Sequence, residues 1–249
     1  MKKSYLILFV SILFLSCSQA TTDRTNVKND LSAKYIKSFA TCFTDTVWQV
    51  EDVFGEYVKT GIKSLTKYEL NEFGNFKKIT YYKSDGKLAN IDNYEYIDGK
   101  VSKITTVDND CTITTTFYRT HDEIDSIYSI SNSDAFPLKQ IYEKIEENVY
   151  KVYYYDDPSI GNYVNIYHYD NNGNLLKEVN GISNKTDYEY FYKNGLLIGE
   201  TFYIRDFIYK KEYKYDFDEK GSCIKIEKYN IQNEIKTIEE ITTRNIQYK

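Results

Sequence analysis

The sequence predicts an all-β protein: an elongated, twisted antiparallel β-meander of repeated hairpins, behind an N-terminal signal helix and a flexible tether. Three observations favour this fold. Tyrosine is abundant, with 27 residues against 13 phenylalanines and one tryptophan in a chain of 249. The phrase "YHYDNNGNLL" at 167–176 recurs in altered spelling, and its turn residues recur at short intervals. Tyrosine suits a pleated, half-solvated surface because its ring packs on neighbouring strands while its hydroxyl stays near water.

The first sixteen residues have the pattern of a secretory signal. Lys2 and Lys3 precede an apolar run from Tyr5 to Leu15, which is too short to span a bilayer as a helix but fits the apolar region of a signal peptide. The run ends in "FLSC", whose last residue, Cys17, resembles the acylated cysteine of a bacterial lipobox, in a variant similar to those of Bacteroidetes-type bacteria. The alternative is a plain secreted protein with an incidental cysteine, cut elsewhere.

The lipobox resemblance implies a lipid anchor and a cellular location. Each buried methylene of an acyl chain contributes about 0.8 kcal/mol, so two or more chains hold a protein stably on a membrane. Palmitate or a similar acyl chain on Cys17 would thus give a lipoprotein of the cell envelope, at the outer membrane. Whether it faces the periplasm or the cell surface is left open. Residues 17–29 are polar and are predicted to form the tether.

A repeated turn motif follows in residues 30–249. A glycine or equivalent turn residue is followed two places later by an aliphatic or small apolar residue. Tyrosines at i and i+2 precede many of these turns, and because alternate residues of a strand share a face, each pair forms two rungs on one side of the sheet. The turn and apolar residues are Gly74 and Phe76, Gly86 and Leu88, Gly99 and Val101, Asp122 and Ile124, Gly173 and Leu175, Gly195 and Leu197, Gly221 and Cys223, and Asn233 and Ile235.

The spacing of the turns predicts the layout of the strands. Gly74, Gly86 and Gly99 stand 12 and 13 residues apart, which leaves room for one strand and one turn. Segments of this length form antiparallel hairpins, because a crossover to a parallel strand needs a dozen or more residues of its own. We expect an opposite turn at Ser183–Thr186. Residues 30–249 are therefore predicted to form a single domain, least regular at 125–162, where two or three strands and longer loops are expected. A short helix is predicted over Leu31–Phe43.

Several segments resemble a known repeat family. "YHYDNNGNLLKE", "YELNEFGNFKKITYY" and "YKYDFDEKGSCIKIEKY" are similar to the YD or RHS-type repeat of bacterial surface and secreted proteins. "YKNGLLIGETFY" resembles the related MORN-variant repeat. The resemblance covers residues 66–110 and 163–249. The resemblance implies how neighbouring strands are arranged. It says little about activity, because a sequence repeat reflects the architecture of a protein and not its function.

Composition and motifs indicate no reaction. The formal charge of −5 and the interleaving of lysine with acidic residues do not fit nucleic-acid binding, which needs clustered basic residues. Neither His121 nor His168 has a catalytic partner nearby in sequence. The sequence predicts no catalytic residue, no cofactor and no metal site. Cys42, Cys111 and Cys223 are interpreted as small apolar sheet residues, with a disulfide among them left open.

We therefore expect a non-enzymatic binding or scaffold module of the cell envelope. Its partners are predicted to be the membrane, through acylated Cys17, and a glycan or protein ligand. Two alternatives are an immunity or antitoxin-like partner of a secreted toxin, and an enzyme with a site in the irregular middle region. Tyrosine rings suit stacking on sugar rings, although packing against their own sheet is the simpler explanation. The residues predicted for ligand stacking are Tyr167, Tyr169, Tyr188, Tyr190, Tyr192, Tyr213 and Tyr215.

Overall fold

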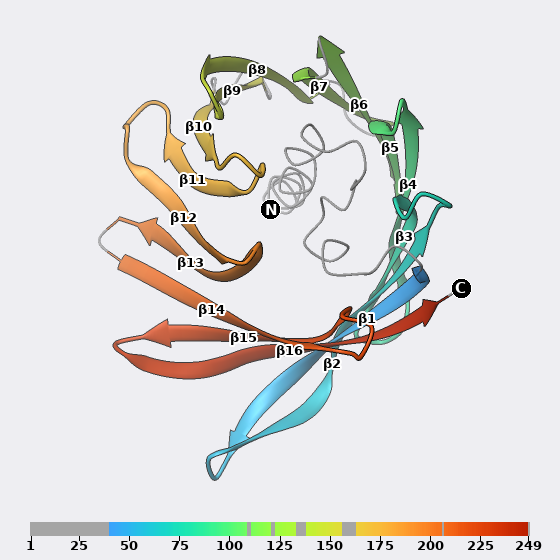
Figure 1. Ribbon diagram of the computed structural model, residues 1–249, viewed down its shortest axis with the longest axis vertical. Helices are drawn as coiled ribbons and strands as arrows, with labels where there is room; N and C mark the ends of the chain where they lie inside the picture. Colours follow the sequence, from blue (N-terminus) through green and yellow to red (C-terminus); the bar gives the residue numbers. More distant parts are fainter. Residues whose placement is uncertain are drawn as a thin grey trace.

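The described part of the chain folds into sixteen antiparallel β-strands (Figure 1). The computed structural model describes residues 40–108, 111–120, 123–132, 138–155, 163–205 and 207–248. The predicted signal peptide, Cys17 and the tether lie outside the described residues, as does His121. The strands are β1 (Ala40–Val53), β2 (Glu56–Leu70), β3 (Phe76–Lys83), β4 (Leu88–Ile97), β5 (Lys100–Asp108), β6 (Thr112–Thr120), β7 (Glu123–Ser131), β8 (Leu138–Glu146), β9 (Val149–Tyr155), β10 (Tyr163–Tyr169), β11 (Leu175–Asn180), β12 (Thr186–Lys193), β13 (Leu196–Ile204), β14 (Phe207–Phe217), β15 (Cys223–Gln232) and β16 (Ile235–Tyr248).

The strands close into a barrel, and this corrects the prediction of an elongated meander. Each strand pairs antiparallel with the next, as predicted, but β16 also returns to pair with β1. Phe43 is opposite Ile246 and Asp45 is opposite Arg244 in this seam. Closure pairs the two strands that an open ribbon would leave as edges, so their backbone groups find partners within the chain. Sequence periodicity describes neighbouring strands only and does not reveal the contact between the first and the last.

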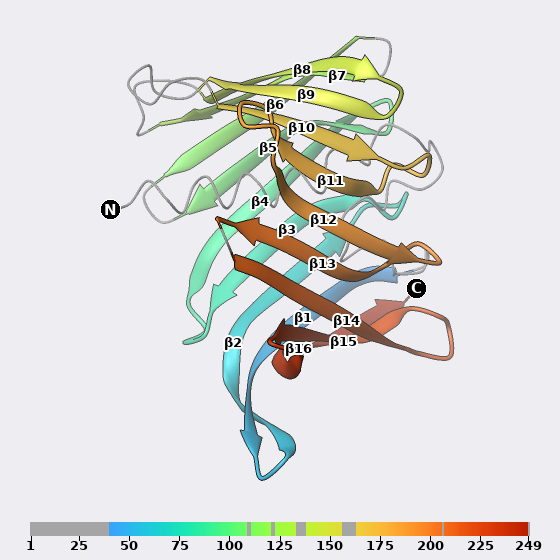
Figure 2. The ribbon, with the colours of Figure 1, turned by 90° about the vertical axis from the view of Figure 1, so that its left-hand side faces the viewer.

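Two local predictions have clear outcomes. The middle region contains β7, β8 and β9, which confirms the expectation of two or three strands there. The helix predicted over Leu31–Phe43 is wrong in its last four residues, because β1 begins at Ala40. No helix among the described residues is long and apolar enough to cross a bilayer. The β1–β2 hairpin is longer than its neighbours and projects from the barrel wall (Figure 2).

Turn chemistry explains the register of the hairpins. In the turn after β10, Asp170 Oδ1 accepts hydrogen bonds from the backbone N–H groups of Asn172 and Asn174, each at 2.8 Å. Gly173 has φ +77°, which glycine adopts without strain. The register then shifts by one residue, so that Leu175 is opposite Tyr169. This bulge places the apolar residue of the turn motif on the same face as the tyrosines. The turns after β2 and β14 have the same design, with Asn71 and Asp218 as acceptors.

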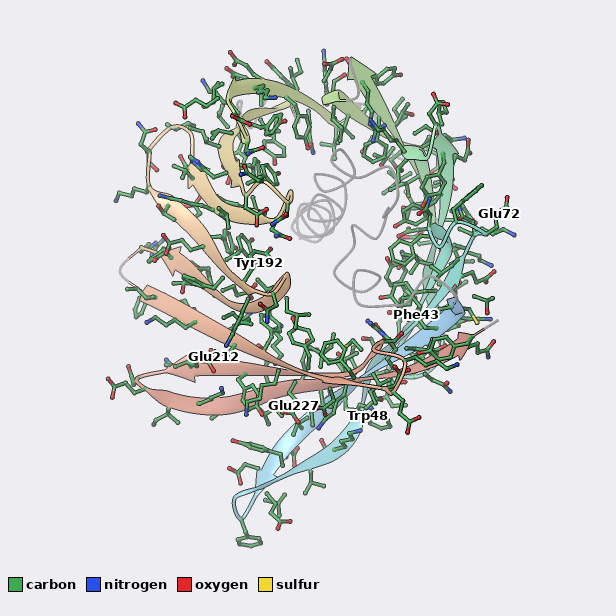
Figure 3. All side chains as sticks on the ribbon, viewed as in Figure 1. Phe43, Trp48, Glu72, Tyr192, Glu212 and Glu227 are labelled. Atoms are coloured by element: carbon green, nitrogen blue, oxygen red, sulfur yellow. The ribbon has the colours of Figure 1, made fainter. Side chains whose placement is uncertain are left out.

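Alternation along each strand gives the barrel two different faces. Phe43 and Tyr192 point toward the inside of the ring of strands, whereas Trp48, Glu212 and Glu227 lie on its outer side (Figure 3). Residues paired in register share a face with one another, which extends this assignment around the barrel. The inner face holds most of the buried side chains, because side chains converge on the concave side of a closed sheet. The outer face carries many charged side chains, together with a smaller apolar cluster of Tyr229, Ile238 and Ile241.

The apolar side chains pack in arcs along the wall. Three clusters of buried residues lie on the inner face, and each is built from neighbouring strands. The rings of Phe43 and Tyr68 stack with centroids 4.2 Å apart in the first of them. Burial of this kind contributes about 25 cal/mol per Å² of apolar surface removed from water. The clusters centre on Phe43, Tyr68 and Ile79; on Ile104, Phe117 and Ile127; and on Val152, Tyr167, Leu175, Tyr190 and Leu197.

Candidate binding surface on the inner wall

The structure brings the predicted stacking tyrosines together on the inner wall. They come from three strands that alternate with others in the sheet, β10, β12 and β14. Tyr167 is paired with Glu178 of β11, and Glu178 is paired in turn with Tyr188 of β12, so all three side chains share the inner face. Tyr167 and Tyr190 are buried, whereas Tyr188 is 37% exposed. The predicted alternation of the tyrosines is thus confirmed, but their role in stacking on a ligand stays a prediction.

Two acidic residues interrupt a regular pattern in this part of the wall. Five residues after its turn residue, most copies of the motif carry isoleucine. After Gly173 and Gly195 the same position holds Glu178 and Glu200 instead. The isoleucines at this position are Ile79, Ile91, Ile104, Ile127, Ile226 and Ile238. Ile79, Ile104 and Ile127 are each 1% exposed, so in three copies of the motif this position holds a deeply buried side chain, whereas Ile91 and Ile226 are half-buried.

Glu178 is a half-buried carboxyl that accepts a hydrogen bond from a phenol. Its Oε1 accepts a hydrogen bond of 2.7 Å from the hydroxyl of Tyr190. Burial raises the pKa of Glu178 to about 7, and the negative charges of Asp187 and Glu200 act in the same direction, while the Tyr190 hydrogen bond opposes them. The pKa of Tyr190 is raised by burial and by the charge of Glu178, so this phenol remains a donor at neutral pH.

Glu200 repeats this arrangement one hairpin further along the chain. It is opposite Lys211 of β14, and Lys211 Nζ lies 3.4 Å from Glu200 Oε1. The pKa of Tyr213 is raised by burial, then by the charge of Glu200 and a hydrogen bond to it. Glu178 is opposite Tyr188 in the register, and Tyr190 lies two residues further along β12. Glu200 is opposite Lys211, and Tyr213 lies two residues further along β14, so the two Glu–Tyr pairs have the same geometry. We name Glu178, Tyr190, Glu200 and Tyr213 the acid–tyrosine wall.

A group of hydroxyls and one amide borders the acid–tyrosine wall. The hydroxyls of Tyr154 and Tyr167 are 2.5 Å apart, and Asn165 Nδ2 donates to the Tyr167 hydroxyl at 3.3 Å. Asn165 is 6% exposed, and its Oδ1 is buried without a hydrogen-bond partner among the described residues. Tyr163, 46% exposed, lies on the same face, and the pKa of its hydroxyl is raised by burial and by the charges of Asp187 and Glu178. An unsatisfied buried acceptor is costly, so Asn165 Oδ1 favours the approach of a further hydrogen-bond donor.

The other residues considered from the sequence lie apart from this wall. His168 is paired with Val149 and Lys177 on the outer face, opposite to its neighbouring tyrosines as predicted, and burial lowers its pKa. Cys223 is fully buried on the inner face, which confirms its interpretation as an apolar sheet residue. Cys42 and Cys111 are half-buried, and all three cysteines are free thiols in the described structure. No group of three or more His, Cys, Asp and Glu side chains among the described residues is placed to hold a metal ion.

The outer face carries opposite charges on neighbouring strands. Lys103 Nζ lies 2.6 Å from Glu95 Oε1, and Lys225 Nζ lies 3.6 Å from Asp216 Oδ2 of β14 as well as 2.6 Å from Glu227 Oε1 of its own strand. Tyrosine hydroxyls bind further carboxylates there, as in the hydrogen bond of 2.7 Å from Tyr203 to Glu189. Such cross-strand pairs stabilise a sheet face in water. The residues of opposite charge that are directly opposite in the register are Glu69 and Lys78, Glu95 and Lys103, Glu143 and Lys151, Lys177 and Glu189, Lys214 and Glu227, and Asp216 and Lys225.

Comparisons with known proteins give little beyond the fold. No family model matches the sequence, and no curated protein matches it. Among solved structures, the chain is similar to a porin-like protein from Bacteroides uniformis. That likeness has a TM-score of 0.39 at 11% sequence identity and covers 87% of this chain and all of the other.

Sequence reasoning identified the tyrosines of the wall but missed the two glutamates. Each was treated as one more charged residue in a strand. The signal was present in the alignment of the turns, because a glutamate stands at a position where the other copies of the motif have isoleucine. Asn165 and the seam pair of Asp45 with Arg244 had no comparable signal, since their environment depends on strands distant in sequence.

Proposed function

We propose that this protein is a lipid-anchored lipoprotein of the cell envelope whose barrel lies in water and acts as a non-enzymatic binding or scaffold module. Acylation of Cys17 would hold it at the outer membrane, and the inner wall would bind the ligand. The observation that carries the proposal is the distribution of charge between the two faces.

A barrel embedded in a membrane has an apolar outer band with aromatic girdles, and its charged residues face the lumen. Here most cross-strand pairs of lysine and acidic residues lie on the outer face, and the clusters that centre on Phe43, Ile104 and Tyr167 lie inside. A lysine on the lipid-facing side of a barrel costs about 2–4 kcal/mol at the bilayer midplane. Lys103 and Lys225, with their partners, would all meet that cost in a bilayer, whereas water solvates them. The outer charges therefore favour an anchor outside the barrel, which acylated Cys17 would supply.

Exchange of the signal peptide tests this proposal. The wild-type chain is compared with a chain that starts at residue 18 behind a leader cut by a different signal peptidase. We expect the wild type to incorporate labelled palmitate and to sediment with membranes. The chain lacking Cys17 should be unlabelled and soluble as a monomer without detergent. Retention of that chain in the membrane, with release only by detergent, would contradict a water-exposed barrel. Protease treatment of intact cells then distinguishes the surface from the periplasmic face.

A further inference from the structure

We propose that the acid–tyrosine wall binds an aliphatic amine, with the carboxylate of Glu178 paired to a protonated amino group and the neighbouring tyrosine rings packed against the ligand. This inference rests on the proposed binding role of the inner wall and adds the chemical class of the ligand. Tyrosine-rich surfaces can bind neutral sugars or cations, and the inference selects a cation as the ligand.

The first argument is the cost of the glutamates. The copies of the motif with isoleucine show what the fold favours at this position. Burial of a carboxyl there is unfavourable, because desolvation disfavours its charged form. A hydrogen bond from Tyr190 offsets only part of this cost. A ligand that carries the missing positive charge would offset the rest, and strongly perturbed acids away from ion pairs are typical of functional sites.

The second argument is the sign of the local charge. Burial raises the pKa of Tyr188, and the charges of three carboxylates, those of Glu178, Glu200 and Asp187, raise it further. The cation that pairs with them is Lys211, which lies beside Glu200. The region is therefore negative, and tyrosine ring faces attract cations as well. A neutral sugar would gain nothing from this potential, whereas a protonated amine gains from the carboxylates and from the rings.

The third argument is the unsatisfied acceptor beside the wall. An ammonium group has three donors and no acceptor, so it needs several oxygen atoms around it. The Oδ1 of Asn165 is such an oxygen, buried on the inner face two register pairs along from Tyr167 and Glu178. Glu178 and Glu200 lie two strands apart, which is about 10 Å across the sheet. The wall therefore suits an extended ligand such as a diamine or polyamine, or a peptide with lysine side chains.

Calorimetric titration of the mature, acylated protein in detergent micelles tests the inference, with putrescine and spermidine as probes and a neutral glucose oligosaccharide for comparison. We expect both amines to bind the wild type. Glu178→Gln should weaken binding about tenfold or more, because a charged hydrogen-bonded pair is lost. Glu200→Gln should weaken it less, since Lys211 already partners this residue. Glu178→Ile restores the residue of the other copies, so it should fold and fail to bind.

The matched control is Glu189→Gln on the outer face of β12. Glu189 accepts a hydrogen bond of 2.7 Å from Tyr203, as Glu178 does from Tyr190. It therefore makes the same kind of hydrogen bond on the outer face of the sheet. Its affinity for amines should equal that of the wild type. Failure of the wild type to bind amines would overturn the inference, as would equal losses in Glu178→Gln and Glu189→Gln. Binding of the oligosaccharide alone would overturn the amine while leaving a binding role for the inner wall.

Discussion

At the seam between β1 and β16, the carboxylate of Asp45 meets a guanidinium, whereas on β11 the carboxylate of Glu178 meets a phenol. Arg244 Nε and Nη2 donate to the two oxygens of Asp45 at 2.6 and 2.8 Å, and both side chains are buried. Burial alone would lower the pKa of Arg244, but the hydrogen bonds and charge of Asp45 raise it. The seam thus buries a neutral pair, and the acid–tyrosine wall buries acid in excess.

The difference separates two reasons for placing a charge inside a fold. The seam pair joins the first and last strands in a fixed register, and its bidentate geometry specifies which residues meet. Asp45 and Arg244 are therefore explained by the closure of the barrel. Glu178 and Glu200 lie on strands whose register is already set by their hairpin turns. In most other copies of the motif, isoleucine occupies the same position. Their presence is not explained by the fold, which is the reason to assign them to a ligand.

Removal of the cation from the seam should give the largest loss of stability. In Arg244→Met, the Asp45 carboxylate stays buried without its partner, and such a change costs about 3–5 kcal/mol. Trp48, the single tryptophan, donates from Nε1 to Thr243 Oγ1 at 2.8 Å across this seam, so its fluorescence reports unfolding in urea. The double variant Asp45→Val/Arg244→Met should recover much of the loss. A loss as large in the double variant as in Arg244→Met would show that the pair does not act as a unit.

The sequence predicted the part of the fold that is local. Glycine and asparagine turns, the antiparallel pairing of successive strands, and the shared face of Tyr167 and Tyr169 all depend on a few adjacent residues. Closure depends on Asp45 and Arg244, which are 199 residues apart, and their pairing leaves no period in the sequence. The candidate site divides in the same way. Its tyrosines follow from alternation, and its glutamates become visible only when all copies of the turn are compared.

The stability of the barrel should fall as pH rises from about 5 to 7. The pKa of Glu178 is about 7 in the folded protein and 4.5 in its ordinary state, so between these values the folded chain holds a proton that the unfolded chain has lost. The stabilising effect is complete below pH 4.5 and is lost as pH rises through 7. It amounts to about 3 kcal/mol. Urea unfolding at several pH values should show this slope in the wild type but not in Glu178→Gln.

A seam variant sharpens the same measurement. Arg244→Met lowers stability at every pH between 5 and 8, but it leaves Glu178 in place, so the slope between pH 5 and 7 should persist. If the wild type and Arg244→Met show the same slope of stability against pH but different overall stabilities, the carboxylates of Asp45 and Glu178 act independently. A slope that vanished with Arg244→Met would instead locate the titrating group at the seam.

Glu178→Ile should stabilise the unliganded barrel at pH 7 by about 1–2 kcal/mol, because an apolar side chain replaces a carboxyl that is costly to bury. The same exchange in reverse, Ile104→Glu, places a carboxyl among Phe117 and Ile127 and should destabilise the protein. Thermal unfolding followed by circular dichroism measures both. Stabilisation by Glu178→Ile together with loss of amine binding would identify the glutamate as a functional residue that the fold does not need. If Glu178→Ile instead destabilised the barrel, Glu178 would be a structural residue.

The outer face should give the smallest effect. Lys103 and Glu95 form an ion pair of 2.6 Å, but both side chains are more than a third exposed, so water and salt screen the interaction. Lys103→Ala should therefore cost less than about 1 kcal/mol, and the cost should shrink in 1 M salt. Urea unfolding at low and high salt measures it. A loss comparable with that of Arg244→Met would mean that the outer pairs are as shielded from water as the seam, and the distinction between a solvated outer face and a buried inner one would not hold.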